Sequence, residues 1–292
     1  MPTSSRNRCF LNVSLGALGL SDKYFGIFNI MLDATNASVK LLSEEEIIAK
    51  WTGVVSEPLV SILQKENQYS QGVRIGPIIK KHCTGKYFAL CEGDDYWISK
   101  DKLSKQVASL EEHPQAGMAF HAAYKKSEGN GSYKIVGMHS EKKVKTFSEI
   151  LSAGGGGVPT ASIVYRAGLW EKMNQIAGYC PVGDLVVQHI SSLFDYAIYS
   201  NEIMSVYRTD VPGSWSQRKT TSSSRIAFQK KLLNYYDHLE ELCLEKNKST
   251  RDVKKRKLVV NLNAIKYSIK KLDVVYGSYC FYLLAANSLK YF

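Results

Sequence analysis

A short apolar run that ends in a cluster of acids limits most strongly what this chain can fold into. Tyr87 to Cys91 is nearly continuously apolar, and Glu92-Gly93-Asp94-Asp95 follows it directly. Such a run predicts a central strand covered on both faces, because a strand with one face in water alternates apolar and polar residues. Acids at the end of this strand predict a site at the carboxyl edge of a sheet, where open α/β sheets bind their ligands.

Strand and helix patterns alternate up to about residue 215, and they predict an α/β layered domain. The predicted strands cover residues 58–63, 87–91, 118–124, 162–165, 196–199 and 203–207. The predicted helices begin near residues 43, 75, 102, 146 and 184. Thr146 and Glu149 have the spacing of a capping box, which marks the start of one of these helices.

Beyond residue 216 the sequence changes to a purely helical pattern. Two apolar stripes repeat at helical spacing, Leu232, Tyr236, Leu239 and Cys243 in the first and Leu258, Leu262, Ile265, Ile269 and Leu272 in the second. Stripes of this kind predict two amphipathic helices that pack as a C-terminal α-helical hairpin.

The charge balance favours anionic partners. The 292 residues carry a formal net charge of +11, which attracts nucleic acid, anionic lipid head groups or phosphorylated ligands. No nucleic-acid-binding motif is recognisable, so we expect no nucleic-acid partner. The run Lys254-Lys255-Arg256-Lys257 leaves two interpretations open: a peripheral membrane contact with anionic lipid, or an ordinary solvated helix face.

The start of the chain has only a faint likeness to a targeting signal. Arg6 and Arg8 precede the stretch from Cys9 to Leu20, but polar residues interrupt it and no clean cleavage site follows. No stretch reaches the roughly 18 apolar residues of a membrane span. The six cysteines lie far apart, which favours free thiols in a reducing compartment. We therefore expect a cytoplasmic location, which includes the inner face of the membrane.

The acids after the apolar run predict a metal site. Glu92, Asp94 and Asp95 would repel one another unless a cation neutralised them. Carboxylate oxygens are hard ligands that suit Mn2+ or Mg2+, and these ions also bridge phosphate oxygens of a substrate. Gly93 would let the backbone approach such a ligand closely. The alternative is a solvated acidic turn that caps the next helix.

The region from Gly85 to Trp97 resembles the metal-binding motif of family 2 glycosyltransferases. Other segments resemble the same family in the same order, namely Lys102-Leu103 with Gln106 to Pro114, Pro159 to Arg166, Val182-Gly183-Asp184, and Met204 to Ser216. Together with the upstream stretches 42–62 and 64–72, the resemblance covers about residues 41–216. Several ordered segments are far more specific than one short motif.

This resemblance implies an inverting, hexosyltransferase-type enzyme with a GT-A fold, a Rossmann-like mixed sheet with flanking helices. Its donor would be a nucleotide-sugar, a UDP-sugar by preference. Its acceptor would be a hydroxyl group of a glycan or of a lipid-linked molecule in cell-surface polysaccharide biosynthesis. On the matching positions it implies Asp184 as catalytic base, Asp94 and Asp95 as ligands of Mn2+ or Mg2+, and Glu92, Asp94, Asp95, Arg208 and Trp215 as donor-binding residues.

The chain also departs from the family pattern. After Ile62 the family has two further strand–helix units, which hold the uracil and ribose contacts, but here Leu63 follows at once. The expected fold is therefore an incomplete GT-A domain over residues 41–216, after an unassigned segment 1–40 and before a helical region 217–292. Either the chain is a shortened relative, active or inactive, or residues 1–40 rebuild part of the sheet.

Simpler roles remain open for the candidate residues. Asp184 would also serve as the N-cap of its helix, Arg208 as a surface residue and Trp215 as a packed one. We expect His121 and His189 to be packed in the core rather than bound to metal. For the whole chain, the alternatives to an enzyme are a catalytically inactive remnant that binds a glycan or a protein, and a basic adaptor at a membrane surface.

Overall fold

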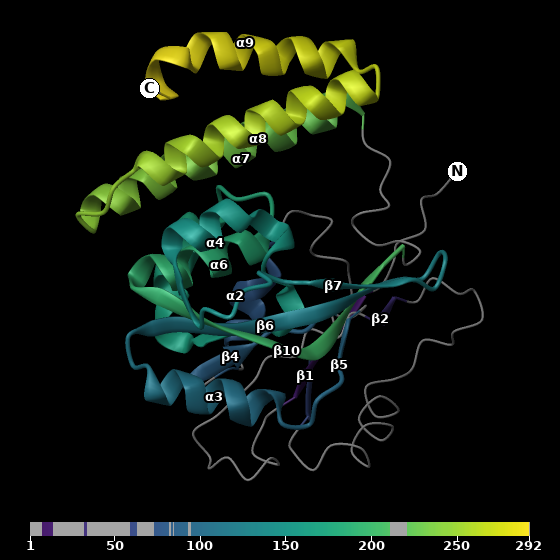
Figure 1. The fold of residues 1–292 in the computed structure, drawn as a ribbon, viewed down its shortest axis with the longest axis vertical. Helices are drawn as coiled ribbons and strands as arrows, with labels where there is room; N and C mark the ends of the chain where they lie inside the picture. Colours follow the sequence, from purple (N-terminus) through teal and green to yellow (C-terminus); the bar gives the residue numbers. More distant parts are fainter. Residues whose placement is uncertain are drawn as a thin grey trace.

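The computed structural model describes side chains for most of the chain after residue 72. The described ranges are 73–74, 76–81, 83, 85–92, 95–210 and 221–285, with the backbone of 8–13, 32–33, 59–62, residue 75 and 286–291 in addition. Its main element is a seven-stranded mixed sheet of order β4-β9-β6-β10-β5, in which β7 pairs with β6 and β8 with β10 (Figure 1). These strands are β4 (Tyr87–Ala89), β5 (Tyr96–Trp97), β6 (Ala116–Ser127), β7 (Tyr133–Val136), β8 (Val144–Thr146), β9 (Val164–Arg166) and β10 (Tyr196–Thr209).

A small second sheet is built from the N-terminal part of the chain. It has the order β2-β1-β3 and consists of β1 (Arg8–Val13), β2 (Leu32–Asp33) and β3 (Leu59–Ile62), all antiparallel. The predicted strand at 58–63 is therefore confirmed. Residues 1–40, which the sequence left unassigned, supply two of the three strands and pair with it. Within the described strands, no pairing joins this sheet to the larger one.

The strand before the acidic motif is buried on both faces, as predicted, but it is not central. All three residues of β4 are at most 2% exposed. Phe88 packs into the large core cluster on one face of the sheet, whereas Tyr87 and Ala89 pack into a smaller cluster on the other. Among the described strands, β4 lies at one end of the sheet and pairs only with β9. Helices on both faces explain its apolar sequence.

Helices cover both faces of the main sheet. The helix α3 (Lys102–Glu112) packs against one face through Leu103, Val107 and Leu110. The other face carries α2 (Ile75–Lys80), α4 (Phe147–Ala153), α5 (Trp170–Ala177) and α6 (Gly183–Phe194) (Figure 1). Predicted helices near residues 75, 102, 146 and 184 are thus confirmed. The one predicted near residue 43 lies outside the described residues.

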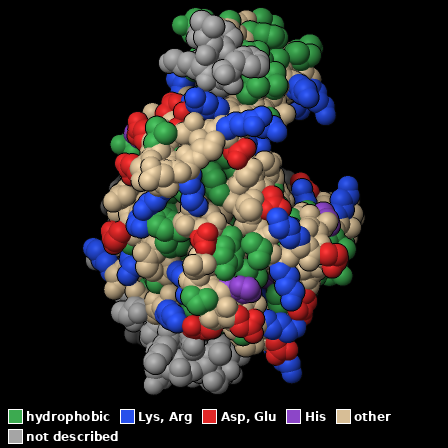
Figure 2. Space-filling view, turned by 60° about the vertical axis from the view of Figure 1, so that its left-hand side comes forward, with side chains coloured by type: hydrophobic (Ala, Val, Ile, Leu, Met, Phe, Trp, Pro, Cys, Tyr) green, Lys and Arg blue, Asp and Glu red, His purple; other side chains and the backbone are tan. Residues whose placement is uncertain are grey.

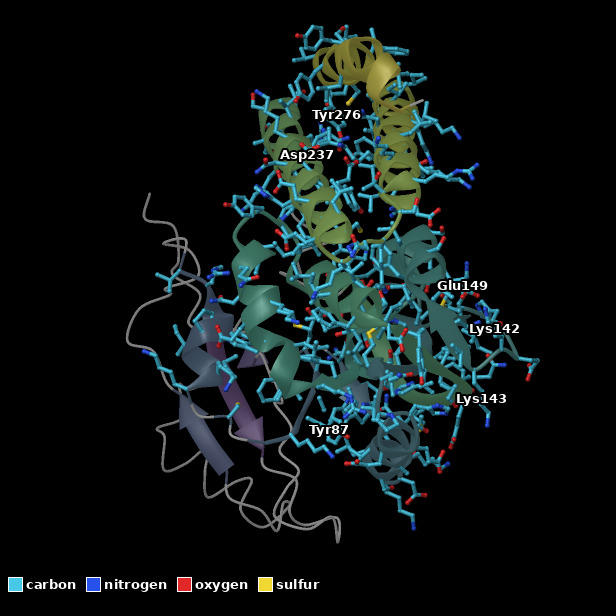
Figure 3. All side chains as sticks on the ribbon, turned by 90° about the vertical axis from the view of Figure 1, so that its left-hand side faces the viewer. Tyr87, Lys142, Lys143, Glu149, Asp237 and Tyr276 are labelled. Carbon is cyan, nitrogen blue, oxygen red and sulfur yellow. The ribbon has the colours of Figure 1, made fainter. Side chains whose placement is uncertain are left out.

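Local signals in the sequence placed several element boundaries correctly. Thr146 and Glu149 form the predicted capping box, in which the Thr146 side chain accepts from the backbone N–H of Glu149 and the Glu149 side chain accepts from that of Thr146. Figure 3 shows Glu149 beside Lys142, with which it makes an ion pair of 3.1 Å. Other boundaries were wrong: the predicted strands 196–199 and 203–207 form one irregular strand, β10.

The C-terminal region is a layer of three helices rather than a hairpin of two. It contains α7 (Ser222–Glu245), α8 (Arg251–Lys270) and α9 (Val274–Tyr291), and it lies over α4 and α6 (Figure 1). The first predicted stripe is confirmed, since its four residues on α7 are all at most 8% exposed. Figure 3 places Asp237 on α7 and Tyr276 on α9 within this layer. Within the described residues, no helix combines the length and the apolar character needed to cross a bilayer.

The second predicted stripe is wrong for most of its length. Ile265 is buried, but Ile269 is 63% and Leu272 87% exposed. The inner face of α8 carries polar and small residues instead, because Asn261 accepts from Gln229 of α7 at 2.8 Å and Ala264 packs beside it. Figure 2 shows hydrophobic side chains on the outer surface of this layer, at the top of the view.

The sheet and α6 approach so closely at one point that only glycine fits. A Cβ atom added to Gly117 of β6 would lie 1.9 Å from the carbonyl oxygen of Ser191 on α6. Since that oxygen belongs to the backbone, relief requires a shift of the whole helix.

Gly117→Ala is therefore expected to lower the free energy of unfolding by about 3 kcal/mol or more, because it overpacks a helix–sheet contact. Gly178→Ala is the matched control, since a Cβ there meets nothing within 4 Å, and it should change stability by less than about 0.5 kcal/mol. Urea unfolding of the two variants measures both values. Equal stability of the two variants would contradict the close packing of α6 on β6.

Candidate functional site

The end of β4 and the start of β9 lie side by side, and this pairing assembles the candidate site. Ala89 pairs with Val164 in the antiparallel ladder. One residue further, the backbone N–H of Leu90 donates to the carbonyl of Ile163 at 3.1 Å. The acidic motif after β4 is therefore next to the 3-10 turn η4 (Thr160–Ser162) that precedes β9.

Asp95 anchors the acidic motif to the sheet. Its backbone N–H donates to the carbonyl of Glu92 at 3.0 Å. Its Oδ1 accepts from the backbone N–H of Arg208 on β10 at 2.9 Å, and the residue is only 8% exposed. The motif is thus joined to two strands, β4 through the chain and β10 through a carboxylate.

The described acids have the donor chemistry of a site for a hard cation. Glu92 and Asp95 offer carboxylate oxygens, which Mn2+ and Mg2+ prefer, although one oxygen of Asp95 already accepts from Arg208. Among the residues that the structure describes, no three of His, Cys, Asp and Glu come together as a metal site. Asp94 lies outside those residues, so metal binding by Asp94 and Asp95 stays a prediction.

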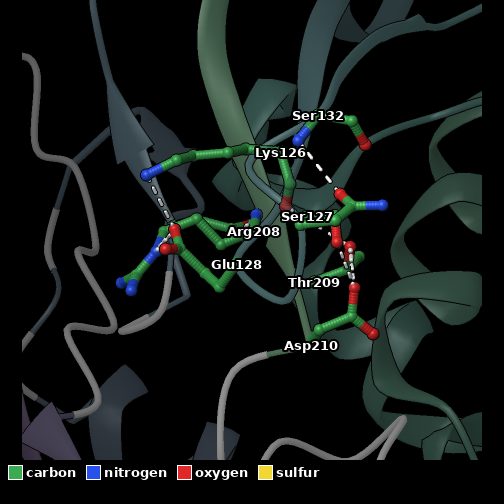
Figure 4. A network of polar contacts seen from close by, with 9 residues as sticks. Lys126, Ser127, Glu128, Ser132, Arg208, Thr209 and Asp210 are labelled. Carbon is green, nitrogen blue, oxygen red and sulfur yellow. Dashed lines mark hydrogen bonds and ion pairs between the residues drawn. The ribbon is translucent and has the colours of Figure 1, made fainter.

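Arg208 lies in an ion-pair network at the end of β10 (Figure 4). Its Nε donates to Oε1 of Glu128 at 2.8 Å, and Nζ of Lys126 is 3.0 Å from the same oxygen. The hydrogen bonds from Arg208 and then Lys126 lower the pKa of Glu128 below its ordinary value. A phosphate would compete with Glu128 for these two cations. Trp215, the other predicted donor contact, lies outside the described residues.

The network lies where ligands bind in sheets of this kind. The strands β6 and β10 run parallel, with Lys125 opposite Tyr207 and Lys126 opposite Arg208. Their carboxyl ends therefore meet at one edge of the sheet, the edge at which open α/β sheets bind ligands. Because Asp95 binds the backbone of Arg208, the acidic motif and these cations belong to the same edge.

Asp184 is a buried carboxylate at the start of α6. Oδ2 accepts from the hydroxyl of Thr160 at 3.1 Å. Oδ1 has no contact with solvent. Burial raises the pKa of Asp184, and hydrogen bonds from Thr160 and from the backbone N–H groups of Leu185 and Asp184 only partly offset this effect. The expectation that Asp184 is the N-cap is wrong, because α6 begins at Gly183 and its N-cap is Val182.

Each residue of the turn η4 is fixed by a different partner. Thr160 binds Asp184. The carbonyl of Ala161 accepts from Nε1 of Trp97 at 2.9 Å. The carbonyl of Ser162 accepts from Nε2 of Gln106 at 2.7 Å. Trp97 belongs to β5 just after the acidic motif, so the turn connects that motif to the buried carboxylate.

A buried lysine completes this connection. Nζ of Lys102 donates to Oε1 of Gln106 at 2.8 Å and lies 4.1 Å from the centre of the Trp97 ring. Lys102 is fully buried, and burial lowers its pKa to about 7. Lys102 and Gln106 were noted in the sequence only as part of a resemblance, and their position under the turn could not be inferred from it.

Both core histidines are packed, as expected. His121 and His189 are 0% exposed, and burial lowers the pKa of each to about 3. Nδ1 of His189 is 3.0 Å from the hydroxyl of Tyr235 on α7. They therefore remain neutral at physiological pH, one in the sheet and the other against the helical layer.

Sequence reasoning identified Glu92, Asp95, Asp184 and Arg208 in the described part of the site. It noted Thr160 and Trp97 only within segments that resemble the family and gave them no role. The signal for Trp97 was its position after the motif, since a buried indole N–H needs an acceptor. No local signal identified Thr160, because its contact with Asp184 spans 24 residues.

Comparisons with known proteins found relatives in sequence and in structure. No protein-family profile matches the chain. Over 141 residues it is 31% identical to the uncharacterized proteins Rv1520 of Mycobacterium tuberculosis and Mb1547 of Mycobacterium bovis, a match that covers 47% of this chain. The match spans 38% of the length of these relatives.

A solved structure shows the fold more directly. The chain is similar to S. aureus TarS 1-349 in complex with UDP-GlcNAc, with a TM-score of 0.53 and 13% sequence identity. The similarity covers 80% of this chain and 61% of that one. TarS is a glycosyltransferase. The chain has a glycosyltransferase-like fold. The predicted class, a mixed α/β sheet with flanking helices and a helical C-terminal region, is confirmed, whereas membership of family 2 stays a prediction.

Asp184→Asn is expected to make the protein more stable at neutral pH. The folded protein binds a proton to Asp184 more tightly than the unfolded chain does, so the wild type loses stability as the pH rises from 3.8 through the raised pKa. The neutral amide has no such pH dependence, so the variant and the wild type should have the same free energy of unfolding at acid pH. Urea unfolding over a pH series measures this free energy for both proteins.

Asp101→Asn is the matched control for this series. Asp101 is exposed and makes no side-chain hydrogen bond to cap α3, so its variant should keep the pH dependence of the wild type. If Asp184→Asn also kept the pH dependence of the wild type, the carboxylate of Asp184 would not be desolvated in the folded protein.

Proposed function

We propose that the chain is a glycosyltransferase that transfers a sugar from a nucleoside-diphosphate-sugar donor to a hydroxyl group of a glycan or lipid-linked acceptor. The observation that carries this proposal is the turn η4. It holds the buried carboxylate of Asp184 through Thr160 and is itself bound by Trp97, next to the acidic motif. These contacts support a proton acceptor and a donor-binding edge that lie close together on a glycosyltransferase-like fold.

The acidic motif supplies the donor side in this proposal. Glu92, Asp94 and Asp95 would hold Mn2+ or Mg2+, and the bound cation would stabilise the negative charge of the diphosphate leaving group. The crystallised TarS fragment contains UDP-GlcNAc, which supports a UDP-sugar as donor. Arg208 and Trp215 would close over the diphosphate, with Arg208 exchanging its contact with Glu128 for a phosphate oxygen.

Asp184 acts as the general base. Thr160 holds Oδ2, and in this proposal the acceptor hydroxyl reaches the buried Oδ1, which takes its proton as the hydroxyl oxygen attacks the anomeric carbon. The new sugar–oxygen bond forms while the bond from sugar to phosphate breaks, and the nucleoside diphosphate leaves with the bonding electrons. A desolvated carboxylate with a raised pKa is a stronger base than an exposed one, which suits it to this step. Attack opposite the leaving group gives inversion.

The cellular role that we propose comes from the family resemblance. It is cell-surface polysaccharide biosynthesis by transfer to a glycan or lipid-linked acceptor, at a cytoplasmic location and in peripheral contact with the inner face of the membrane. The alternative function is that of a catalytically inactive glycosyltransferase remnant that binds a glycan or protein. Two contacts favour this alternative, because they engage groups that the enzyme would need for the metal and the phosphate. Asp95 binds the backbone of Arg208, and the Arg208 side chain binds Glu128.

Titration of UDP into the purified chain, with and without Mn2+, tests the donor side. Asp94→Asn should lose the Mn2+-dependent binding, whereas Asp184→Asn should keep it because Asp184 contacts the acceptor hydroxyl instead. Glu112→Gln, a change of an exposed acid on α3, is the matched control and should bind as the wild type does.

Release of UDP from UDP-GlcNAc in the presence of glycan acceptors tests transfer. Asp184→Asn should lower the rate by about 100-fold or more, which is the contribution expected of a general base. UDP binding without any turnover, for this and other UDP-sugars, would favour the inactive remnant. A folded chain that binds no nucleoside diphosphate would refute the donor site altogether.

A further inference from the structure

The turn between α8 and α9 exposes a cluster of apolar side chains. Leu272 is 87%, Val274 77% and Val275 63% exposed, and Ile269 in the last turn of α8 is 63% exposed. Scattered apolar residues are normal on a protein surface, but a contiguous cluster indicates an interaction site. We define the α8–α9 tip as these residues together with Lys266, Tyr267, Lys270 and Lys271.

We propose that the α8–α9 tip docks on an anionic lipid bilayer. This places the membrane contact at the tip and not at the run 254–257, which lies near the other end of α8, and it does not depend on sugar transfer. The apolar side chains would enter the interface while the neighbouring lysines bind lipid phosphates, as in other proteins that lie on a membrane.

The exposed face of α9 continues the apolar surface. Val274, Phe281 and Tyr282 lie at helical positions i, i+7 and i+8, and they are 77%, 52% and 67% exposed. The sequence from Val274 to Ala285 contains no charged residue. A helix with such an outer face on an otherwise charged protein suits an interfacial position.

The charge around the tip selects an anionic partner. Residues 246–292 contain 11 Lys and Arg but only two acids, Asp252 and Asp273, so this segment carries +9 of the net +11. Asp273 is 9% exposed and forms an ion pair of 2.6 Å with Arg225. The exposed charges of the tip are therefore all positive. A second copy of the same face would be repelled, whereas an anionic bilayer would be attracted.

The tip contains a leucine where the backbone favours glycine. Asp273 N–H donates to the carbonyl of Ser268, and Leu272 N–H to that of Ile269, which is the Schellman pattern at a helix end. This places Leu272 at the position after the C-cap, with φ of 53°. Glycine or asparagine is usual there, because the left-handed backbone crowds a Cβ atom and asparagine offsets that cost with local hydrogen bonds.

The end of α7 provides an internal comparison. It has the same pattern, in which Lys248 N–H donates to the carbonyl of Cys243 and Asn247 N–H to that of Leu244, and the left-handed residue is Asn247 with φ of 52°. The chain thus uses the usual residue at one helix end and an exposed apolar residue at the other. Since Leu272 is 87% exposed, folding does not require its side chain, whereas bilayer docking would use it.

The tip is held rigidly enough to act as a docking surface. The carboxylate of Asp273 accepts from Arg225 and Ser222 of α7 and from the backbone N–H of Tyr276 on α9. Below these contacts, Tyr276 and Ile265 are buried in a separate core cluster of the helical layer. The side chains of the tip therefore project from a fixed frame, and docking does not have to order a loop.

Co-sedimentation of the full chain with vesicles tests the proposal, using phosphatidylcholine alone and phosphatidylcholine with phosphatidylglycerol. The wild type should bind only the anionic vesicles, and salt should weaken the binding. Leu272→Gly should bind about tenfold less, and Lys270→Gln with Lys271→Gln about 25-fold less, at about fivefold per lysine. Leu272→Gly should be at least as stable as the wild type in urea, because glycine relieves the left-handed backbone.

Two matched controls separate the tip from general properties of the chain. Leu244→Ser removes a leucine that is 64% exposed at the end of α7, and Lys254→Gln with Lys255→Gln removes two lysines elsewhere on α8. Both should bind vesicles as the wild type does. Three outcomes would overturn membrane docking by the tip. The control variants lose as much binding as the tip variants, or the wild type binds both kinds of vesicle equally. In the third, the tip drives self-association that Leu272→Gly abolishes. Leu272→Gly should bind UDP as the wild type does. A negative vesicle result would therefore count against membrane docking but not against the donor site.

Discussion

The geometry of the candidate site depends on the turn between residues 160 and 162, which is bound from three directions. Thr160 donates to Asp184 on α6, and the next two carbonyls accept from Trp97 of β5 and Gln106 of α3. The carbonyls could not be buried without these donors, because an unpaired buried acceptor costs about 1–3 kcal/mol. Hydrogen bonding that stabilises the fold therefore also fixes the distance between the acidic motif and the buried carboxylate.

The helix that carries Asp184 is positioned from both sides. Its backbone at Ser191 touches β6 at Gly117, where no side chain fits. On its other side, His189 contacts the hydroxyl of Tyr235 on α7, and both side chains are fully buried. The helical layer is thus part of the framework of the site. A desolvated carboxylate destabilises the folded state at neutral pH, and this double packing of α6 compensates for that cost.

Local patterns in the sequence predicted much of the fold, whereas contacts between distant segments were beyond them. Apolar runs and a capping box placed β4 and α4 because their signals lie within a few residues. The edge position of β4, the bond from Asp95 to the backbone of Arg208 and that from Thr160 to Asp184 depend on pairings between distant segments. For the site, the sequence therefore identified the carboxylates but not the groups that hold them.

The orientation of α8 shows why an apolar stripe can mislead. The prediction assumed that the apolar residues of a helix face the protein interior. This assumption holds when the outer face of the helix is in contact with water. In the structure Asn261 and Ser268 face inward, and Asn261 is bound to Gln229, while Leu262 and Ile269 face outward. The inner face of α8 is thus polar and hydrogen-bonded, and its outer face is apolar and bordered by lysines. Contact between that apolar outer face and water is unfavourable. The same arrangement is favourable at the boundary between water and lipid, where the outer face has an apolar phase to enter.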